Sequence, residues 1–90
     1  MKITDFKLEY PGIYGTITQY SRNPYIVGYL DTMKEYIVEG DLENLRTCIN
    51  KVLIWYNANF ENIMTNEYVL NKEDHKITKT ILENAYKKLS

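Results

Sequence analysis

The sequence predicts a mainly α-helical fold, in which three helices form the core and an N-terminal β-hairpin packs across them. Three segments after residue 23 place apolar residues every three or four positions, as one buried face of an α-helix requires. The first twenty residues show alternation instead, which is typical of a half-buried strand. Because ninety residues is the size of one domain, we expect a single domain over residues 1–90.

The β-hairpin is predicted over residues 3–20. Phe6, Leu8 and Tyr10 alternate with charged residues, and the following Pro11-Gly12 is typical of a turn. Residues 13–20 are rich in isoleucine, threonine and tyrosine, which favour strands. An isolated hairpin is only marginally stable in water, so this one is expected to pack on the helices.

The first helix is predicted over residues 24–39. Asn23-Pro24 is a typical helix start, with an N-cap residue followed by proline at the first helical position. Gly40 is expected to end this helix, because glycine readily adopts the left-handed backbone conformation that follows a helix. Asp41 can then cap the next helix at once.

Two further helices are predicted over residues 41–64 and 72–89. The apolar face of the 41–64 helix is wide enough to indicate contact from two sides, which makes it the central element. Residues 57–59 could interrupt that helix, although we expect it to continue through them. Asn71 is expected to cap the last helix, whose first turn is acidic and whose last turn is basic, as the helix dipole favours.

Composition excludes several classes of protein. The chain has 11 basic and 12 acidic side chains, a net charge of −1, and 44% apolar residues. It is therefore too apolar for bulk disorder and not basic enough to bind nucleic acid by charge alone. No apolar run approaches a membrane span, and residues 1–10 lack the apolar core of a signal peptide, so we expect a cytoplasmic protein with no membrane partner.

Catalysis, cofactors and metals are not expected. The single cysteine, Cys48, is interpreted as a small buried hydrophobe, and the single histidine, His75, as a near-surface residue in the first turn of the last helix. A cysteine nucleophile needs a neighbouring base, and a metal site needs more ligands than Asp74-His75 provides. Motifs for phosphate loops, nucleophile elbows and zinc proteases are missing from the sequence.

The candidate site is an acidic surface beside tyrosines. On a helical wheel of residues 24–39, the acidic residues lie opposite the apolar stripe, with tyrosines on one flank. Residues 31–43 hold five acids and one lysine, a net charge of −4. Such a surface suits docking on a basic protein, where charge speeds association and tyrosines supply affinity. The candidate partner-binding residues are Tyr29, Asp31, Glu35, Tyr36, Glu39, Asp41 and Glu43.

Two segments also resemble a known group of proteins. Residues 36–45, YIVEGDLENL, are followed by a long apolar helix, a short connection and residues 71–75, NKEDH, which open a terminal helix. This arrangement resembles the small helical immunity proteins of bacterial polymorphic-toxin and contact-dependent growth inhibition systems. The resemblance covers residues 24–89 and implies a cytoplasmic protein that binds a cognate toxin domain, often a nuclease, and neutralises it.

Two alternatives remain open at this point. A phage or plasmid anti-defence protein that binds a host effector complex would share this size and acidity. A small nucleic-acid-associated regulator would instead use the lysines on the outer face of the last helix. The lysines of that outer face are Lys72, Lys76, Lys79 and Lys87. The oligomeric state is not determined by the sequence.

Overall fold

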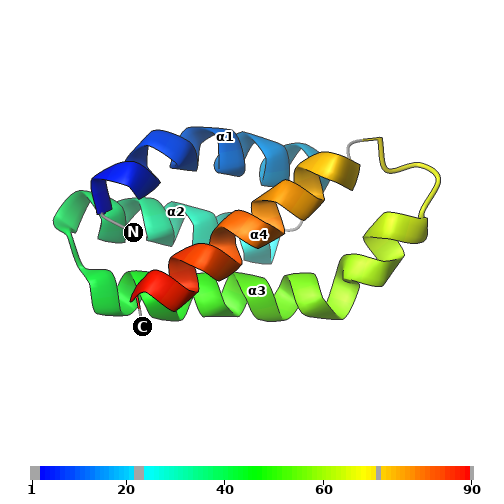
Figure 1. The fold of residues 1–90 in the computed structure, drawn as a ribbon. Helices are drawn as coiled ribbons and strands as arrows, with labels where there is room; N and C mark the ends of the chain where they lie inside the picture. The colour runs from blue at the N-terminus through cyan, green and yellow to red at the C-terminus, as the bar shows by residue number, and fades with distance from the viewer. Residues whose placement is uncertain (1–2, 22–23, 71, 90) are drawn as a thin grey trace.

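The computed structural model describes residues 3–21, 24–70 and 72–89, and over those residues it is a bundle of four α-helices (Figure 1). Consecutive helices run in opposite directions, and α4 crosses the bundle obliquely. α1 packs on α2 and α4, and α3 packs on the same two helices, so the four helices enclose one core. They are α1 (Ile3–Ser21), α2 (Pro24–Glu39), α3 (Leu42–Thr65) and α4 (Lys72–Leu89).

The predicted N-terminal β-hairpin is wrong. Residues 3–20 belong to α1, and no strand occurs in the described ranges. A helical stripe is present in this segment: Phe6, Tyr10, Ile13 and Ile17 are spaced by four, three and four residues, and all four are buried. Leu8, which suggested the alternation, is 79% exposed. The core therefore receives a fourth helix rather than a covering hairpin.

Pro11 lies inside α1 rather than in a turn. Proline in a helix interior removes one hydrogen bond and clashes with the preceding turn, at a cost of about 3 kcal/mol. Burying the aliphatic and aromatic side chains of the stripe offsets this, since each contributes roughly 1.5–3 kcal/mol. The Tyr10 hydroxyl also donates a buried hydrogen bond to the backbone carbonyl of Leu30 on α2.

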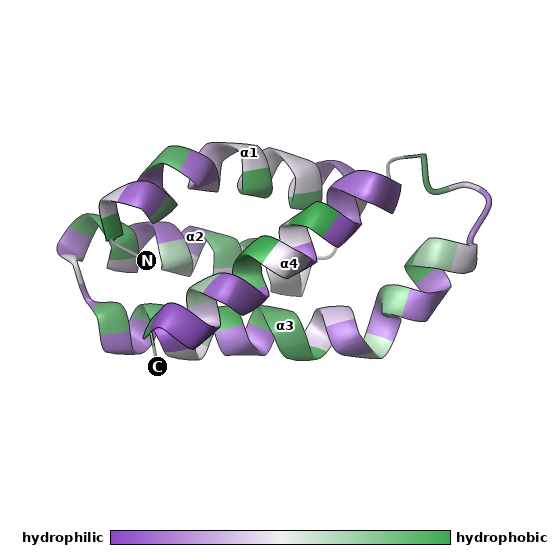
Figure 2. Ribbon diagram, viewed as in Figure 1, coloured by the Kyte–Doolittle hydropathy of each residue, from purple (hydrophilic) through white to green (hydrophobic). Residues whose placement is uncertain are grey.

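The core lies along the inside of all four helices (Figure 2). α3 supplies more of the fully buried apolar side chains than any other helix, which fits its wide apolar face and its contacts with both α2 and α4. α3 also continues without a break through residues 57–59. The buried residues of α2 and α3 are Leu30, Met33, Ile37, Leu45, Cys48, Ile49, Val52, Leu53 and Tyr56.

Gly40 forms the tight joint between α2 and α3. Its φ of 74° lies in the left-handed region, which glycine adopts without strain. The Asp41 amide donates to the Tyr36 carbonyl at 3.0 Å, and the Gly40 amide donates to the Ile37 carbonyl at 3.3 Å, so the joint is a Schellman motif. Asp41 then caps α3 by accepting a hydrogen bond from the Asn44 amide at 3.2 Å.

The two other predicted caps, Asn23 and Asn71, lie outside the described residues. Among the helices that the structure describes, no segment combines the length and apolar character that a membrane crossing requires.

Candidate functional site

Three of the predicted carboxylates form one surface on α2. Asp31, Glu35 and Glu39 are exposed and line a shallow depression together with Lys34 and Val38. We call these three carboxylates the acidic face. The two ion pairs recorded among the described residues both lie on α4, so neither neutralises the acidic face. Even with Lys34 in the same depression, the five residues that line it carry a net charge of −2, which attracts a cationic partner.

α1 extends the acidic face on one side. Tyr10, Pro11 and Tyr14 line a groove between α1 and α2 with Asp31 and Lys34, and its volume is about 290 Å³. The negative charge of Asp31 raises the pKa of the neighbouring Tyr14 hydroxyl. A lysine or arginine side chain entering this groove would meet a carboxylate beside aromatic rings, an arrangement that attracts cations.

The two predicted tyrosines lie on the other flank of α2. Tyr29 and Tyr36 are half-buried against the core and border a groove of about 160 Å³ between α2 and α3. The Lys51 ammonium lies 5.4 Å from the centroid of the Tyr29 ring. These rings therefore already have partners within the chain, and the face that contains the carboxylates is bordered by Tyr14 instead.

Asp41 and Glu43 lie at the start of α3. Both Asp41 carboxylate oxygens accept hydrogen bonds from Asn44, at 3.2 Å from its amide nitrogen and 2.7 Å from its side chain. Asp41 thus has a structural use as the cap of α3. Glu43 is exposed in the first turn, where the helix dipole favours a negative charge.

The single cysteine and histidine have separate buried environments. Cys48 is 3% exposed, its thiol lies 3.2 Å from the Tyr29 carbonyl, and burial raises its pKa to about 11. A thiol with that pKa is almost entirely protonated at neutral pH, so it is a poor nucleophile.

His75 is buried rather than near the surface, which contradicts the sequence-based interpretation. Its Nδ1 atom lies 2.9 Å from the Tyr56 hydroxyl, and the two rings make an edge contact with centroids 5.8 Å apart. Burial lowers the pKa of His75, while the charge of Asp74 acts in the opposite direction. Within the described residues, no three side chains of the metal-binding types come together.

The sequence did not lead us to predict that α1 borders the acidic face with Pro11 and Tyr14. The prediction of strands over residues 3–20 placed Pro11 in a turn and gave Tyr14 no position relative to α2. The spacing of Phe6, Tyr10 and Ile13 is the signal that would have found a helix there.

Comparison with known proteins shows a similarity to a bacterial protein. The chain is 33% identical over 82 residues to a protein of Bacillus subtilis (strain 168) described as uncharacterized protein YddK. The match covers 91% of this chain and 29% of that protein, so the chain spans less than a third of the relative's length. A scan of protein families finds no match, and no solved structure matches.

Proposed function

We propose that this chain is a non-catalytic protein-binding inhibitor of the immunity-protein kind, which docks on a basic toxin domain through the acidic face. The observation that supports this most is the alignment of Asp31, Glu35 and Glu39 on one exposed side of α2, apart from the ion pairs recorded on α4. Aligned carboxylates of this kind attract a basic surface and orient it during encounter.

The groove between α1 and α2 supplies contacts that exclude water, which charge alone does not provide. Rim charges mainly raise the association rate, whereas affinity depends on contacts that lose their water. Tyr14 and Pro11 offer such contacts immediately beside Asp31. In the proposed complex, a partner's lysine or arginine enters this groove, and the remaining carboxylates lie over the basic surface around it.

Affinity capture from source cells tests this function. Tagged wild-type chain is compared with a variant carrying Glu35→Lys and Glu39→Lys, and captured proteins are quantified by mass spectrometry. The matched control carries Glu61→Lys and Glu67→Lys, which makes the same charge change at two exposed positions away from α2. Lysine in the last turn of a helix suits the helix dipole, so reversal at Glu39 is compatible with folding.

We expect one basic protein in near-equal amount with the wild type and the control, and a clearly smaller amount with the α2 variant or at high salt. Equal recovery with all three chains would reject the acidic face as the docking surface. Capture of a large complex through the same face would identify an anti-defence protein instead of an immunity protein.

A further inference from the structure

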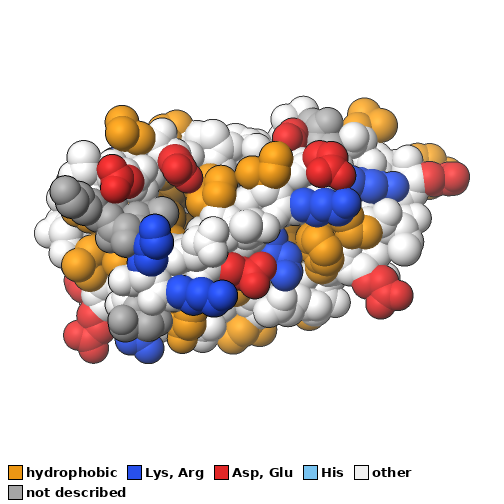
Figure 3. Space-filling model, viewed as in Figure 1, with side chains coloured by type: hydrophobic (Ala, Val, Ile, Leu, Met, Phe, Trp, Pro, Cys, Tyr) orange, Lys and Arg blue, Asp and Glu red, His pale blue; other side chains and the backbone are white. Residues whose placement is uncertain are grey.

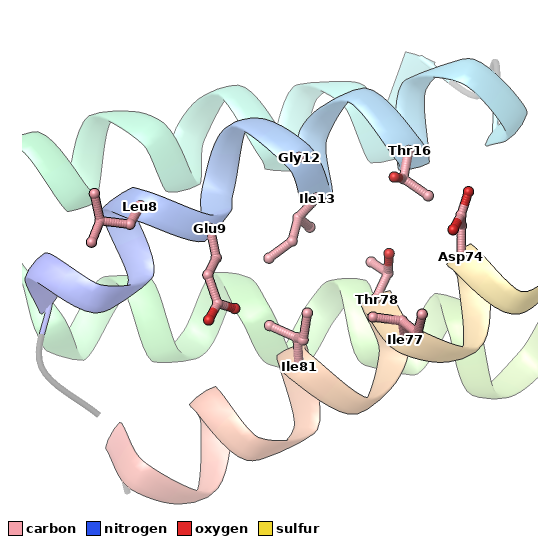
Figure 4. A pocket seen from close by; sticks show the side chains of 9 residues that line it. All are labelled: Leu8, Glu9, Gly12, Ile13, Thr16, Asp74, Ile77, Thr78 and Ile81. Atoms are coloured by element: carbon pink, nitrogen blue, oxygen red, sulfur yellow. The ribbon is translucent and has the colours of Figure 1, made fainter.

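A second groove runs between α1 and α4 (Figures 3 and 4). Its volume is about 470 Å³. It shares no lining residue with the acidic face or with the α1–α2 groove. The lining residues are Leu8, Glu9, Gly12, Ile13, Thr16, Asp74, Ile77, Thr78 and Ile81.

The α1–α4 groove is open to solvent, and its lining combines aliphatic side chains with threonines and carboxylates. Ile13 and Thr78 are buried, whereas Leu8 and Ile77 are 79% and 54% exposed. Figure 4 shows Ile81 on α4 pointing toward α1, with Ile77 one turn earlier on the same helix. Leu8 and Ile77 thus leave aliphatic surface at the groove that the apolar side chains of a partner could cover.

Gly12 lines this groove without a side chain. A Cβ atom built at Gly12 would meet nothing within 4 Å, so the space in front of α1 is empty at this point. Glycine inside a helix is less favourable than alanine by roughly 0.5–1 kcal/mol, and no positive φ requires it at Gly12. A leucine side chain at Gly12 would therefore extend into space in front of the groove.

The two charged residues that line the groove, Glu9 and Asp74, are both acidic. Figure 4 shows Glu9 extending from α1 toward α4 near Ile81, and Asp74 at the other end opposite Thr16. Figure 3 shows hydrophobic side chains between acidic ones on this face. Two of the α4 lysines have other contacts: Lys76 pairs with Glu73 at 3.1 Å, and Lys79 pairs with Glu83 at 3.0 Å.

We propose that the α1–α4 groove binds an amphipathic helix of another protein, with an apolar stripe flanked by lysine or arginine at both ends. The apolar stripe would cover Ile77 and Ile81, which lie between Glu9 and Asp74, and the flanking cations would pair with these two carboxylates. Symmetric pairing with a second copy is disfavoured, because it would bring these acidic ends together. This docking site is additional to the acidic face and does not depend on it.

A designed peptide tests the groove directly. The probe is a side-chain-bridged helix of about fifteen residues, because short helices without such a bridge are marginal in water. It carries two leucines one turn apart with a lysine at each end of the stripe. Binding is followed by NMR of isoleucine methyl groups, and we expect saturable shifts at Ile13, Ile77 and Ile81 with a Kd below about 1 mM.

Two matched variants on α1 define the site. Gly12→Leu fills the groove, whereas Gly15→Leu adds the same side chain one turn later, at a position that does not line the groove. We expect Gly12→Leu to abolish the shifts and Gly15→Leu to retain them. A peptide with glutamates in place of the lysines is expected to bind at least about tenfold more weakly, since it places like charges together.

Three results would overturn the proposal. The first is the absence of saturable shifts with the lysine peptide, and the second is equal binding to the Gly12→Leu and Gly15→Leu chains. The third is a concentration-dependent dimer in sedimentation that Gly12→Leu removes, because a second copy of the chain would then be the occupant.

Discussion

At the scale of single residues, Gly40 determines how α2 joins α3. Its left-handed backbone, with φ at 74°, allows the two Schellman hydrogen bonds and leaves Asp41 in position to cap α3. Side chains with a Cβ atom are strained in this conformation by roughly 1–2 kcal/mol. Gly40 is therefore important for its conformational freedom, whereas Gly15, inside α1, is not.

This difference predicts opposite effects of the same substitution. Gly40→Ala is expected to lower the free energy of unfolding by about 1–2 kcal/mol. Gly15→Ala is expected to raise it by about 0.5–1 kcal/mol, because its Cβ meets nothing within 4 Å and alanine favours the helix. Urea unfolding of both variants provides the measurement. Shifts of the same sign would contradict the assigned role of Gly40.

His75 predicts a pH dependence of stability. Burial holds its folded-state pKa below the ordinary value of 6.5, so between those two values the unfolded chain binds more protons than the folded chain. Stability due to neutral His75 is thus fully present above about pH 6.5 and declines as the pH falls toward the folded-state pKa. We expect lower stability at about pH 5.5 than at about pH 7.5 in urea unfolding.

The control for this prediction is His75→Asn, which cannot titrate but can still hydrogen-bond the Tyr56 hydroxyl. Since the sequence contains a single histidine, this variant is expected to lose most of the pH dependence in that interval. An unchanged pH dependence would assign the effect to other groups.

At the scale of elements, α1 shows where the sequence is informative and where it is not. Pro24 favours a helix start and Gly40 a helix end, and the apolar stripe between them has helical spacing. Because these observations agree, the sequence alone predicts the helix over residues 24–39. In residues 3–20 the signals conflict, because Pro11-Gly12 favours a turn while Phe6 and Ile13 fit a helical stripe. Tertiary burial decides this conflict, and burial is not visible in local propensities.

Pro11→Ala distinguishes the two interpretations of this element. In a helix, the change restores a backbone hydrogen bond and removes a steric clash, so stability is expected to rise by up to about 3 kcal/mol. In a hairpin, the same change would weaken the turn and lower stability. Circular dichroism during thermal unfolding measures the outcome, and a lower melting temperature would count against a helical α1.

At the scale of the whole molecule, the sequence allows only part of the candidate site to be predicted. The outward position of Asp31, Glu35 and Glu39 follows from helical periodicity alone. The half-burial of Tyr29 against α3 and the position of Tyr14 beside Asp31 depend on how separate helices pack. Periodicity within one helix gives no information about that packing, so these residues could not be assigned to the correct flank.

The burial of His75 also depends on packing between helices, which the periodicity of one helix does not show. Its place in the first turn of α4 suggested exposure, yet the hydroxyl of Tyr56, nineteen residues earlier, lies within hydrogen-bond distance of its ring. A buried histidine needs such a polar partner, and only the packing of α3 on α4 brings the two together.

The most direct test of the central claim is the association rate between this chain and its captured partner. It would be measured for the wild type, the Glu35→Lys, Glu39→Lys variant and the Glu61→Lys, Glu67→Lys control at ionic strengths of about 0.05 M and about 0.5 M. Docking through the acidic face predicts association about three- to tenfold slower for the α2 variant at low salt, with the difference shrinking at high salt. An α2 variant that associates as fast as the control at low salt would contradict the proposed function.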